Sequence, residues 1–383
     1  MSGATAPSAR EELRPSGFAA PEIFFAIEGL RAVCVLIVML FHSAGSRAEH
    51  VLPGAFFVID FFYAVSGFVL AHAYEARLAH DLRGLGFMRL RLIRVYPLYL
   101  LALAIAVAAN LGIALVRGSL PEPVLFLVSV AASALLLPLV PALAWRHHHP
   151  YPFNGTTWTL FWELAVNLIW SVLGPRLTDR LLALFVAIGA VMLVVGLSLP
   201  TRLEYGGSFA SVHVGGLRVV YGFFSGVAAY RLWSRGRLPW LRLPFWASAP
   251  ILLATILLRP YGGAFVYDLA ATLAMPVLVF ASTAQPPPRL RPLLGAAGQA
   301  TYAAYILNFP LLLVLDQLLA RTHLPLLMSA PVRIPLFVAL VATVSIVADR
   351  RLDHPARKWL FRRFVSPERG HIPGDRPAPV SEA

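Results

Sequence analysis

IEGLRAVCVLIVMLFHSAG, residues 27–45, is the stretch that decides the fold. It is an apolar, helix-forming run in which Arg31 stands near the start and His42 near the end. At about 100° and 1.5 Å per residue, the two fall within about 20° of the same helix face and roughly 16 Å apart. An ionisable residue inside a membrane helix is costly and is by default a functional candidate, so both side chains are expected to face one pore or pocket.

The composition indicates a membrane protein. Of the 383 residues, 58% are hydrophobic and only 13% are charged. The mean hydropathy of +0.71 is more than a soluble domain of this length tolerates on its surface. Arg and Lys exceed Asp and Glu by 32 to 19, but the excess lies in a few short loops, which indicates membrane topology and not nucleic-acid binding. The single cysteine, Cys34, excludes an intrachain disulfide and a cysteine-built metal site.

Apolar segments of near-spanning length recur along the chain and predict an all-α polytopic bundle of transmembrane helices. They lie near residues 27–45, 55–73, 95–116, 124–144, 156–174, 180–199, 211–230, 245–259, 264–283, 299–320 and 330–349. The expected membrane domain covers 23–364, between a polar tail at 1–22 and a second polar tail at 365–383. No cleavable signal peptide is expected, because no apolar core precedes Ile23.

Arginine-rich stretches set the expected orientation. By the positive-inside rule, 74–94, 231–243, 285–292 and the tail from Arg350 lie in the cytoplasm. Counting from both ends then gives about ten crossings with both termini cytoplasmic, and it leaves 124–144 as a segment that does not cross.

Prolines explain why 124–144 would fail to cross. Pro123, Pro138 and Pro141 each remove a backbone donor, which breaks or kinks a helix. The segment is therefore expected to be re-entrant or interfacial. The alternative is that 124–144 spans and the short segment 245–259 does not.

This topology divides the charged residues into two groups. Depth along the helices puts His42, Asp60 and Glu163 roughly 6–11 Å below the outer surface, where they are expected to meet. The cytoplasmic group consists of Arg31, Arg91 and Arg94. A basic cluster inside and a histidine with carboxylates farther out indicate an anionic cytoplasmic donor that reaches toward a base near the other face.

Several stretches resemble one known family in the same order along the chain. The first helix, with Arg31 and His42 in an R-x10-H arrangement, resembles the opening of the integral-membrane acyltransferase 3 family. Residues 60–68 are similar to its D-x-F-F-x-x-S-G-F segment, 91–97 to R-x-x-R-x-Y-P, 154–163 to N-G-x-x-W-S-L-x-x-E, 301–310 to S-Y-x-x-Y-x-x-H-x-P, and Asp353-His354-Pro355 to its closing E-x-P. The resemblance extends from Glu28 to about Trp359.

Three positions depart from the family pattern. Asn308 stands where a histidine is common, Thr159 replaces a serine and Asp353 replaces a glutamate. An asparagine can orient a substrate through hydrogen bonds but does not shuttle a proton at neutral pH. Acid or base chemistry at Asn308 is therefore not expected.

The resemblance implies an enzyme that moves an acyl group, usually acetyl, from cytoplasmic acyl-CoA to a hydroxyl of a glycan, glycolipid or related acceptor. It implies a multi-pass protein of the bacterial inner membrane, with the lipid bilayer around it. Acyl-CoA would be a co-substrate, and no permanently bound cofactor is expected. The run His147-His148-His149 has no carboxylate or cysteine ligands nearby, so a dedicated metal site is not expected.

Side-chain chemistry assigns roles within this implied reaction. A histidine takes a proton near neutral pH, so His42 is the candidate base for the attacking hydroxyl. Glu163 and Asp60 are the candidate carboxylates that would orient its imidazole. The expected CoA phosphate ligands are Arg31, Arg91 and Arg94. The expected acceptor contacts are Tyr302, Tyr305 and Asn308. Both an acyl-enzyme on His42 and direct transfer stay open.

Other interpretations of the same residues also stay open. Arg91 and Arg94 fit ordinary positive-inside residues, Asp60 fits a helix-pairing role, and Ser66 fits close packing better than nucleophilic attack. One rival function is a glycolipid transporter or flippase without acyl-transfer chemistry. A second is an acyltransferase-like scaffold that has lost its chemistry, which Asn308 would explain.

Overall fold

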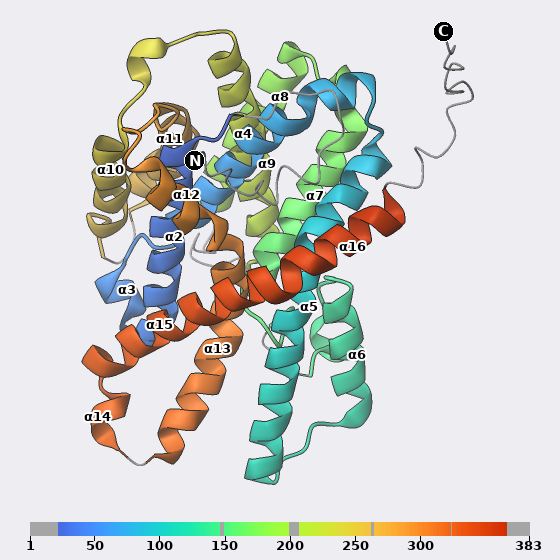
Figure 1. The fold of residues 1–383 in the computed structure, drawn as a ribbon, viewed down its shortest axis with the longest axis vertical. Helices are drawn as coiled ribbons and strands as arrows, with labels where there is room; N and C mark the ends of the chain where they lie inside the picture. Colours follow the sequence, from blue (N-terminus) through green and yellow to red (C-terminus); the bar gives the residue numbers. More distant parts are fainter. Residues whose placement is uncertain (1–21, 146–148, 199–206, 262–263, 323, 366–383) are drawn as a thin grey trace, which may run out of the picture.

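Helices form almost the whole of the computed structural model, which describes residues 22–145, 149–198, 207–261, 264–322 and 324–365. No strand occurs within these ranges. The helices are α2 (Phe25–Ala44), α3 (Ala48–Val51), α4 (Phe57–His80), α5 (Gly84–Arg117), α6 (Pro123–Ala134), α7 (Thr157–Leu173), α8 (Asp179–Ser198), α9 (Val212–Ser234), α10 (Phe245–Leu257), α11 (Phe265–Ala281), α12 (Arg291–Gln299), α13 (Thr301–Arg321), α14 (Pro325–Met328), α15 (Ala330–Ala348) and α16 (His354–Phe364). The predicted all-α helix bundle is confirmed (Figure 1). Nearly all of the two predicted polar tails lies outside the described residues.

Within the part of the chain that the structure describes, seven helical stretches are long and apolar enough to cross a membrane. They are α2, α4, α5, α8, α9, α13 and the continuous stretch from α15 to α16. Shorter apolar helices, α6, α10 and α11, accompany them. The chain is therefore a multi-pass membrane protein, while the number of crossings and the side on which each end lies stay predictions.

The proline-rich segment 124–144 is not one helix. Helix α6 ends at Ala134, and after an irregular stretch only a 3-10 turn follows at Pro141–Leu143. Twelve residues of helix span about 18 Å, against a hydrocarbon core about 30 Å thick. Helix α10 has only 13 residues, so helix length alone does not decide which of the two segments fails to cross.

The prediction that residues 74–94 form a loop is wrong. The arginine-rich stretch 74–94 is mostly helical, because α4 continues to His80 and α5 begins at Gly84. Arg91 and Arg94 therefore lie two to three turns inside a helix of 34 residues. This places both guanidinium groups within the bundle and not in a connecting loop.

Helices α4 and α9 form the closest pair in the bundle. A Cβ atom on Gly67 would collide with the backbone carbonyl of Phe223, and one on Gly226 would collide with that of Ala64. Only glycine permits this separation of the two backbones. The predicted close packing at the Ser66-Gly67 pair thus resides in Gly67.

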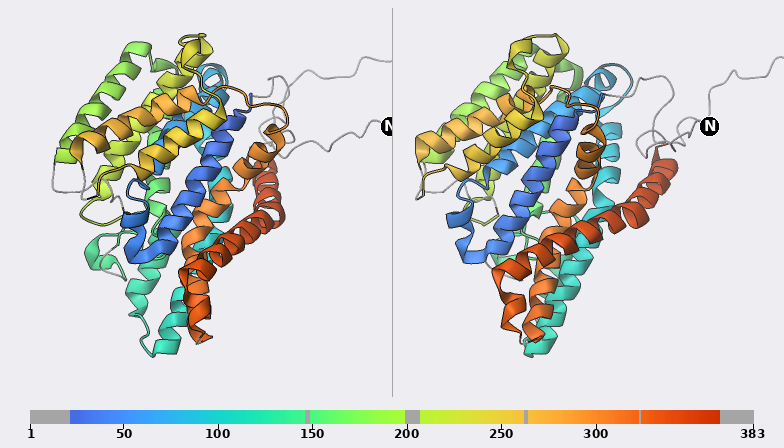
Figure 2. Two further views of the ribbon diagram at one scale, coloured as in Figure 1. Left: turned by 90° about the vertical axis from the view of Figure 1, so that its left-hand side faces the viewer. Right: turned by 60° about the vertical axis from the view of Figure 1, so that its left-hand side comes forward.

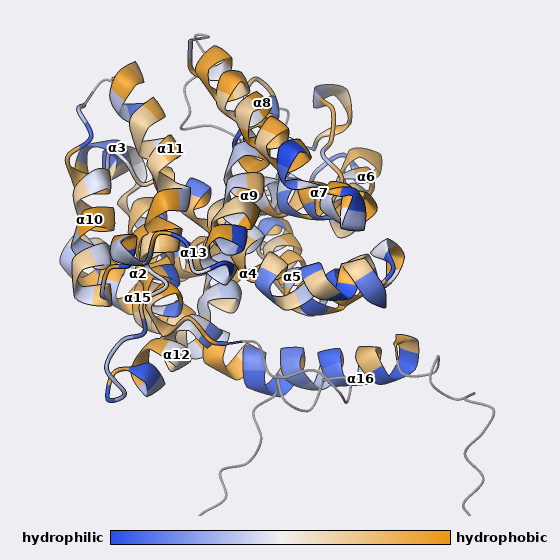
Figure 3. Ribbon diagram, turned by 90° about the horizontal axis from the view of Figure 1, so that it is seen from above, coloured by the Kyte–Doolittle hydropathy of each residue, from blue (hydrophilic) through white to orange (hydrophobic). Residues whose placement is uncertain are grey.

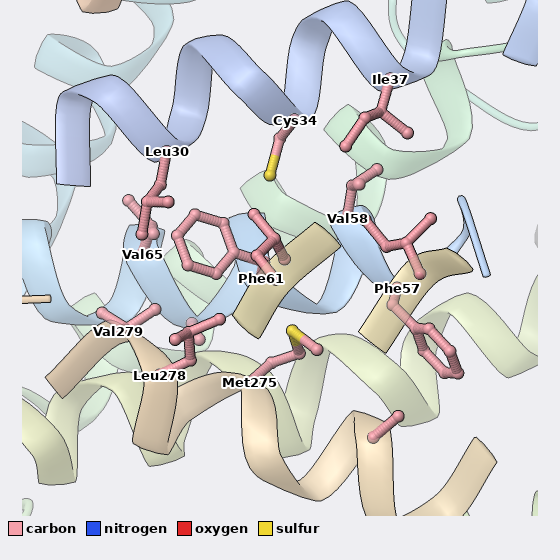
Figure 4. Packing of buried hydrophobic residues seen from close by; sticks show 14 of the residues in the cluster. Leu30, Cys34, Ile37, Phe57, Val58, Phe61, Val65, Met275, Leu278 and Val279 are labelled. Atoms are coloured by element: carbon pink, nitrogen blue, oxygen red, sulfur yellow. The ribbon is translucent and has the colours of Figure 1, made fainter. Parts of the chain in front are cut away.

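Helix α2 packs its apolar face onto this pair and onto α11. Figure 4 shows Leu30, Cys34 and Ile37 of α2 directed toward Phe61 and Val65 of α4. Residues from α11, among them Met275, close the other side. Because all of these side chains are buried, the position of α2, and with it that of Arg31 and His42, is fixed by packing.

The last described residues form a long helical stretch with a π-helical turn within it. A π-helical turn, Asp349–Asp353, joins α15 to α16, and both views in Figure 2 show the two helices crossing the outside of the bundle. Helix α15 packs on α13, and α16 contacts α5. Seen from above, α16 lies along one edge and is largely hydrophilic (Figure 3).

Candidate active site

A cavity of about 230 Å³ opens between α2, α4, α5, α7 and α13. Its lining combines arginines and a carboxylate with tyrosine hydroxyls and an aliphatic wall. The lining residues are Arg31, Val35, Ile59, Phe62, Tyr63, Val65, Ser66, Val69, Leu70, Arg91, Arg94, Val95, Thr159, Leu160, Glu163, Thr301, Tyr302 and Tyr305. Segments from five parts of the sequence that resembled family motifs therefore meet on one cavity.

The three arginines predicted as donor ligands all line this cavity. Arg31 donates to Glu28 one turn earlier in α2, at 2.9 Å. Arg94 donates to Asp353 in the π-helical turn at 3.4 Å, and its guanidinium lies 5.3 Å from the ring centre of Tyr302. Guanidinium groups from two helices thus face one enclosed space, which is an arrangement suited to an anion with several phosphates.

Glu163 lies beside Arg91 and not beside His42. Its Oε1 atom accepts a hydrogen bond from Arg91 at 2.8 Å and a second from the Ser66 hydroxyl at 3.0 Å. Glu163 lies six residues after the start of α7, close to the expected depth, and the difference comes from Arg91, which was expected outside the helix. Arg91 lies seven residues into α5, at a depth where the two side chains meet.

His42 is held by a different residue. Its Nδ1 atom lies 2.6 Å from Oδ1 of Asn308 in α13, and its ring meets the ring of Phe309 edge-on with centroids 6.0 Å apart. His42 follows Val35, which lines the cavity, by seven residues on the same face of α2, or about 10 Å. The cavity lining does not include His42.

Two aromatic rings meet in the wall of the cavity. Phe62 and Tyr305 line the cavity and meet edge-on, with centroids 5.7 Å apart. The Tyr305 hydroxyl lies 2.8 Å from Oγ1 of Thr159. Tyr305 lines the cavity and is one turn before Asn308, the partner of His42, in α13.

Pro310 explains how α13 and the loop before α7 are joined. A proline has no N–H, so the carbonyl of Ile306 four residues earlier loses its helical partner. The Nδ2 atom of Asn154 donates to that carbonyl at 2.9 Å, while Oδ1 of Asn154 accepts from the Thr156 amide at 3.1 Å. Asn154 therefore donates a hydrogen bond to the Ile306 carbonyl, which the proline leaves without a helical partner.

Asp60 forms a buried ion pair with Arg218 in α9. The guanidinium donates to both carboxylate oxygens, at 2.9 and 3.0 Å, and also to the backbone carbonyl of Phe56 at 2.7 Å. The Arg218 side chain is 0% exposed and the Asp60 side chain 2%. The expected contact between Asp60 and His42 is therefore replaced by a closed pair between α4 and α9.

The three residues predicted to contact the acceptor already have partners within the protein. The Tyr302 hydroxyl donates to the carbonyl of Val95 at 2.7 Å, the Tyr305 hydroxyl lies against Thr159, and the Asn308 amide bonds His42. Two of them, Tyr302 and Tyr305, line the cavity. Their rings shape the cavity, while their hydroxyl groups are already engaged within the protein.

Sequence reasoning missed several of these partners. Arg218 stood out as a lone charge in an apolar segment and could have been paired with Asp60 on that ground. The partners of Arg333 were harder to infer from the sequence. Its guanidinium donates to Asp316 at 2.8 Å and also to the carbonyl of Ser43, next to His42. His147 and His148 lie outside the described residues, and no metal-binding cluster of His, Cys, Asp and Glu is found inside them.

Comparisons with known proteins agree with this architecture. The family model of the acyltransferase 3 domain matches residues 24–350. The chain is also similar to protein 2 in the picA locus of Rhizobium radiobacter, with 34% identity over 187 residues, which cover 46% of this chain and 95% of that protein. No solved structure matches. Since the family match covers most of the chain and nearly all of the helical bundle, the protein belongs to the acyltransferase 3 family and is a membrane acyltransferase.

Proposed function

We propose that this enzyme is an O-acyltransferase that takes an acyl group, usually acetyl, from acyl-CoA and transfers it to a hydroxyl of a glycan, glycolipid or related acceptor. His42 is the base in this proposal. The observation that carries it is the joint lining of one cavity by Arg31, Arg91 and Arg94, with His42 farther along the helix that supplies Arg31. The coarse activity follows from the family, and the donor, acceptor and base are the proposed parts.

The cavity has the chemistry that an acyl-CoA requires. Phosphate groups bind guanidinium forks through charge-assisted, often bidentate, hydrogen bonds. Beyond the arginines, the wall is aliphatic at Val35, Val65 and Val69. Such a wall suits the pantetheine arm, which carries the thioester away from the phosphates. The acyl group then has to pass Phe62 and Tyr305 to reach His42.

The reaction needs an unprotonated ring nitrogen on His42. In direct transfer, Nε2 takes the proton of the acceptor hydroxyl while its oxygen attacks the thioester carbonyl. The C–S bond then breaks, and the CoA thiolate takes that proton from the imidazolium. In the acyl-enzyme route, Nε2 itself attacks the carbonyl, the C–S bond breaks and CoA leaves as the thiolate; the acceptor oxygen then displaces the imidazole from the acyl carbon, and the hydroxyl proton passes to the thiolate. Both routes use the same nitrogen.

The test is acyl transfer by purified protein in liposomes. Radiolabelled acetyl-CoA is supplied with lipid and glycan extracts, and labelled products are separated by mass. We expect His42→Ala to lower the rate by about 10²- to 10⁴-fold, the usual contribution of a general base. His213→Ala, which changes an exposed histidine of α9, is the matched control.

The same assay addresses the rival functions. A transporter would move substrate without consuming acyl-CoA, and His42→Ala would leave that movement intact. A scaffold without chemistry would be inactive as the natural sequence and would gain activity in Asn308→His. Wild-type activity that is lost in His42→Ala contradicts both rivals.

We further propose that the protein lies in the inner membrane of a bacterium with both termini in the cytoplasm. The arginine content of the stretches 74–94, 231–243 and 285–292 supports this orientation. Reporter fusions at each terminus, one active only in the cytoplasm and one only outside it, measure the orientation. Mass spectrometry of surface glycans from cells with and without the gene identifies the acyl group and the acceptor.

A further inference from the structure

Asn308 is the polar neighbour of the proposed base. Its side chain is completely buried, and its Oδ1 atom lies 2.6 Å from Nδ1 of His42 on another helix. At that distance a hydrogen lies between the Asn308 amide and the Nδ1 atom of His42. An imidazole nitrogen acts either as a donor or as an acceptor, so the direction of this bond decides which nitrogen of His42 is free.

The amide of Asn308 is oriented by its own helix. Its Nδ2 group donates to the backbone carbonyl of Tyr305, three residues earlier in α13. Turning the amide over would place Oδ1 against that carbonyl oxygen, and two acceptors would face each other. Oδ1 therefore points at His42 and accepts, which makes Nδ1 of His42 the donor.

The turn of α13 that carries this amide is itself anchored. Thr159 donates its hydroxyl hydrogen to the carbonyl of Thr156 at 2.8 Å, so Oγ1 of Thr159 is left to accept from the Tyr305 hydroxyl. One residue later, the carbonyl of Ile306 accepts from Asn154. Contacts from Asn154 and Thr159 thus fix the turn of α13 that orients the Asn308 amide.

We propose that Asn308 is a positioning residue that keeps the proton of neutral His42 on Nδ1 and leaves the lone pair of Nε2 free for acyl transfer. This inference rests on the proposed role of His42 as the base. An amide does the positioning that a carboxylate does in a catalytic triad, without adding a charge to a buried site. It needs no proton transfer by Asn308, so an asparagine at this position is compatible with an active enzyme.

Kinetics of Asn308 variants test the inference. Asn308→Leu keeps the size of the side chain but removes the acceptor, and we expect kcat to fall by about 10²- to 10⁴-fold, because a misplaced proton removes the base. The KM for acyl-CoA should stay unchanged, since the arginine-lined cavity is not altered. Asn308→Asp restores an acceptor for the Nδ1 hydrogen, and its kcat should return to within about tenfold of the natural enzyme.

A matched control separates positioning from general structure. Asn110 in α5 is also buried, at 2% exposed, and its Nδ2 group donates to Ala106 of the same helix at 2.8 Å. Asn110→Leu should change the folded yield at most and leave kcat per folded molecule unaltered. A loss of kcat in Asn110→Leu as large as that in Asn308→Leu would overturn the assignment.

Spectroscopy reads the tautomer directly. In solid-state ¹⁵N spectra of histidine-labelled protein in liposomes, the His42 signals are those that vanish in His42→Ala. We expect a protonated Nδ1 and an unprotonated Nε2 in the natural enzyme, and a shift of the proton to Nε2 in Asn308→Leu. Finding the proton on Nε2 in the natural enzyme, or unchanged kcat in Asn308→Leu, refutes the positioning role. Activity retained in His42→Ala refutes the proposed base instead.

Discussion

Glu163 accepts a hydrogen bond of 2.8 Å from Arg91 at the wall of the cavity. We expect Glu163→Gln to raise the KM for acyl-CoA by about tenfold, because the loss of a charge-assisted bond leaves the Arg91 guanidinium less well placed for phosphate. The kcat at saturating donor should change little. Initial rates over a range of acetyl-CoA concentrations measure both constants.

The control for that variant is Glu75→Gln. Glu75 pairs with Arg231 at 2.7 Å, and the side chains of the two pairs have similar exposure, 25% and 15% against 27% and 15%. Neither Glu75 nor Arg231 lines the cavity. If Glu75→Gln raised the KM equally, the effect of Glu163→Gln would reflect overall stability and not donor binding.

Asp353 links the cavity to the last helix. The carboxylate is fully buried, forms an ion pair with Arg357 of α16 at 2.8 Å and accepts a hydrogen bond from Arg94 of α5 at 3.4 Å. We expect Asp353→Asn to lower the free energy of unfolding by about 1–3 kcal/mol, because two arginines lose a charged partner. It should also raise the KM for acyl-CoA through Arg94. Asp349→Asn, which removes a partner of Arg357 alone, should affect stability and leave the KM unchanged.

The pair of Asp60 and Arg218 is expected to stabilise the fold. Asp60→Asn or Arg218→Met alone should cost about 3–5 kcal/mol, since each leaves one buried charge without its partner. The double variant Asp60→Leu/Arg218→Met should recover most of that loss. Reaction of Cys34, the single and fully buried cysteine, with a thiol-reactive dye during heating reports the unfolding. A stable double variant with greatly lowered kcat would show instead that Asp60 has a catalytic role.

Phe62 contributes an aromatic ring to the wall of the cavity. We expect Phe62→Ala to shift the preference toward longer acyl donors, raising the ratio of kcat/KM for hexanoyl-CoA over acetyl-CoA by at least about tenfold. Competition between the two donors in one reaction measures the ratio. Phe265→Ala, which changes a 43% exposed residue of α11, should leave the ratio as it is, and an equal shift there would point to a general loosening of the bundle.

The sequence predicted the helical segments well because apolar length is a local property. The bounds expected for α2 and α9 agree with the structure to within four residues at every end. Arg31, Arg91 and Arg94 were also expected to gather, and they do so because two of them are neighbours on one helix. The stretch 74–94 was misassigned because its arginines suggested a loop, while nothing in it prevents a helix.

Contacts between helices were predicted less well. Depth arithmetic placed Glu163 with His42, but it assumed that each helix starts at the membrane surface and runs straight across. Helix α5 departs from that assumption, because it begins at Gly84 and carries Arg91 to the depth of Glu163. The partnership of His42 with Asn308 joins residues 266 positions apart, and no spacing within the sequence records it.

The π-helical turn at Asp349–Asp353 sets how α16 is rotated about its axis relative to α15. An α-helix turns by about 100° per residue, so removing Arg350 would rotate Asp353 and all of α16 by about that angle relative to α15. Asp353 would then face away from Arg94, although no residue of the cavity had changed. A one-residue deletion in this turn should thus disturb donor binding more than many substitutions do, and the length of this short segment is as constrained as its composition.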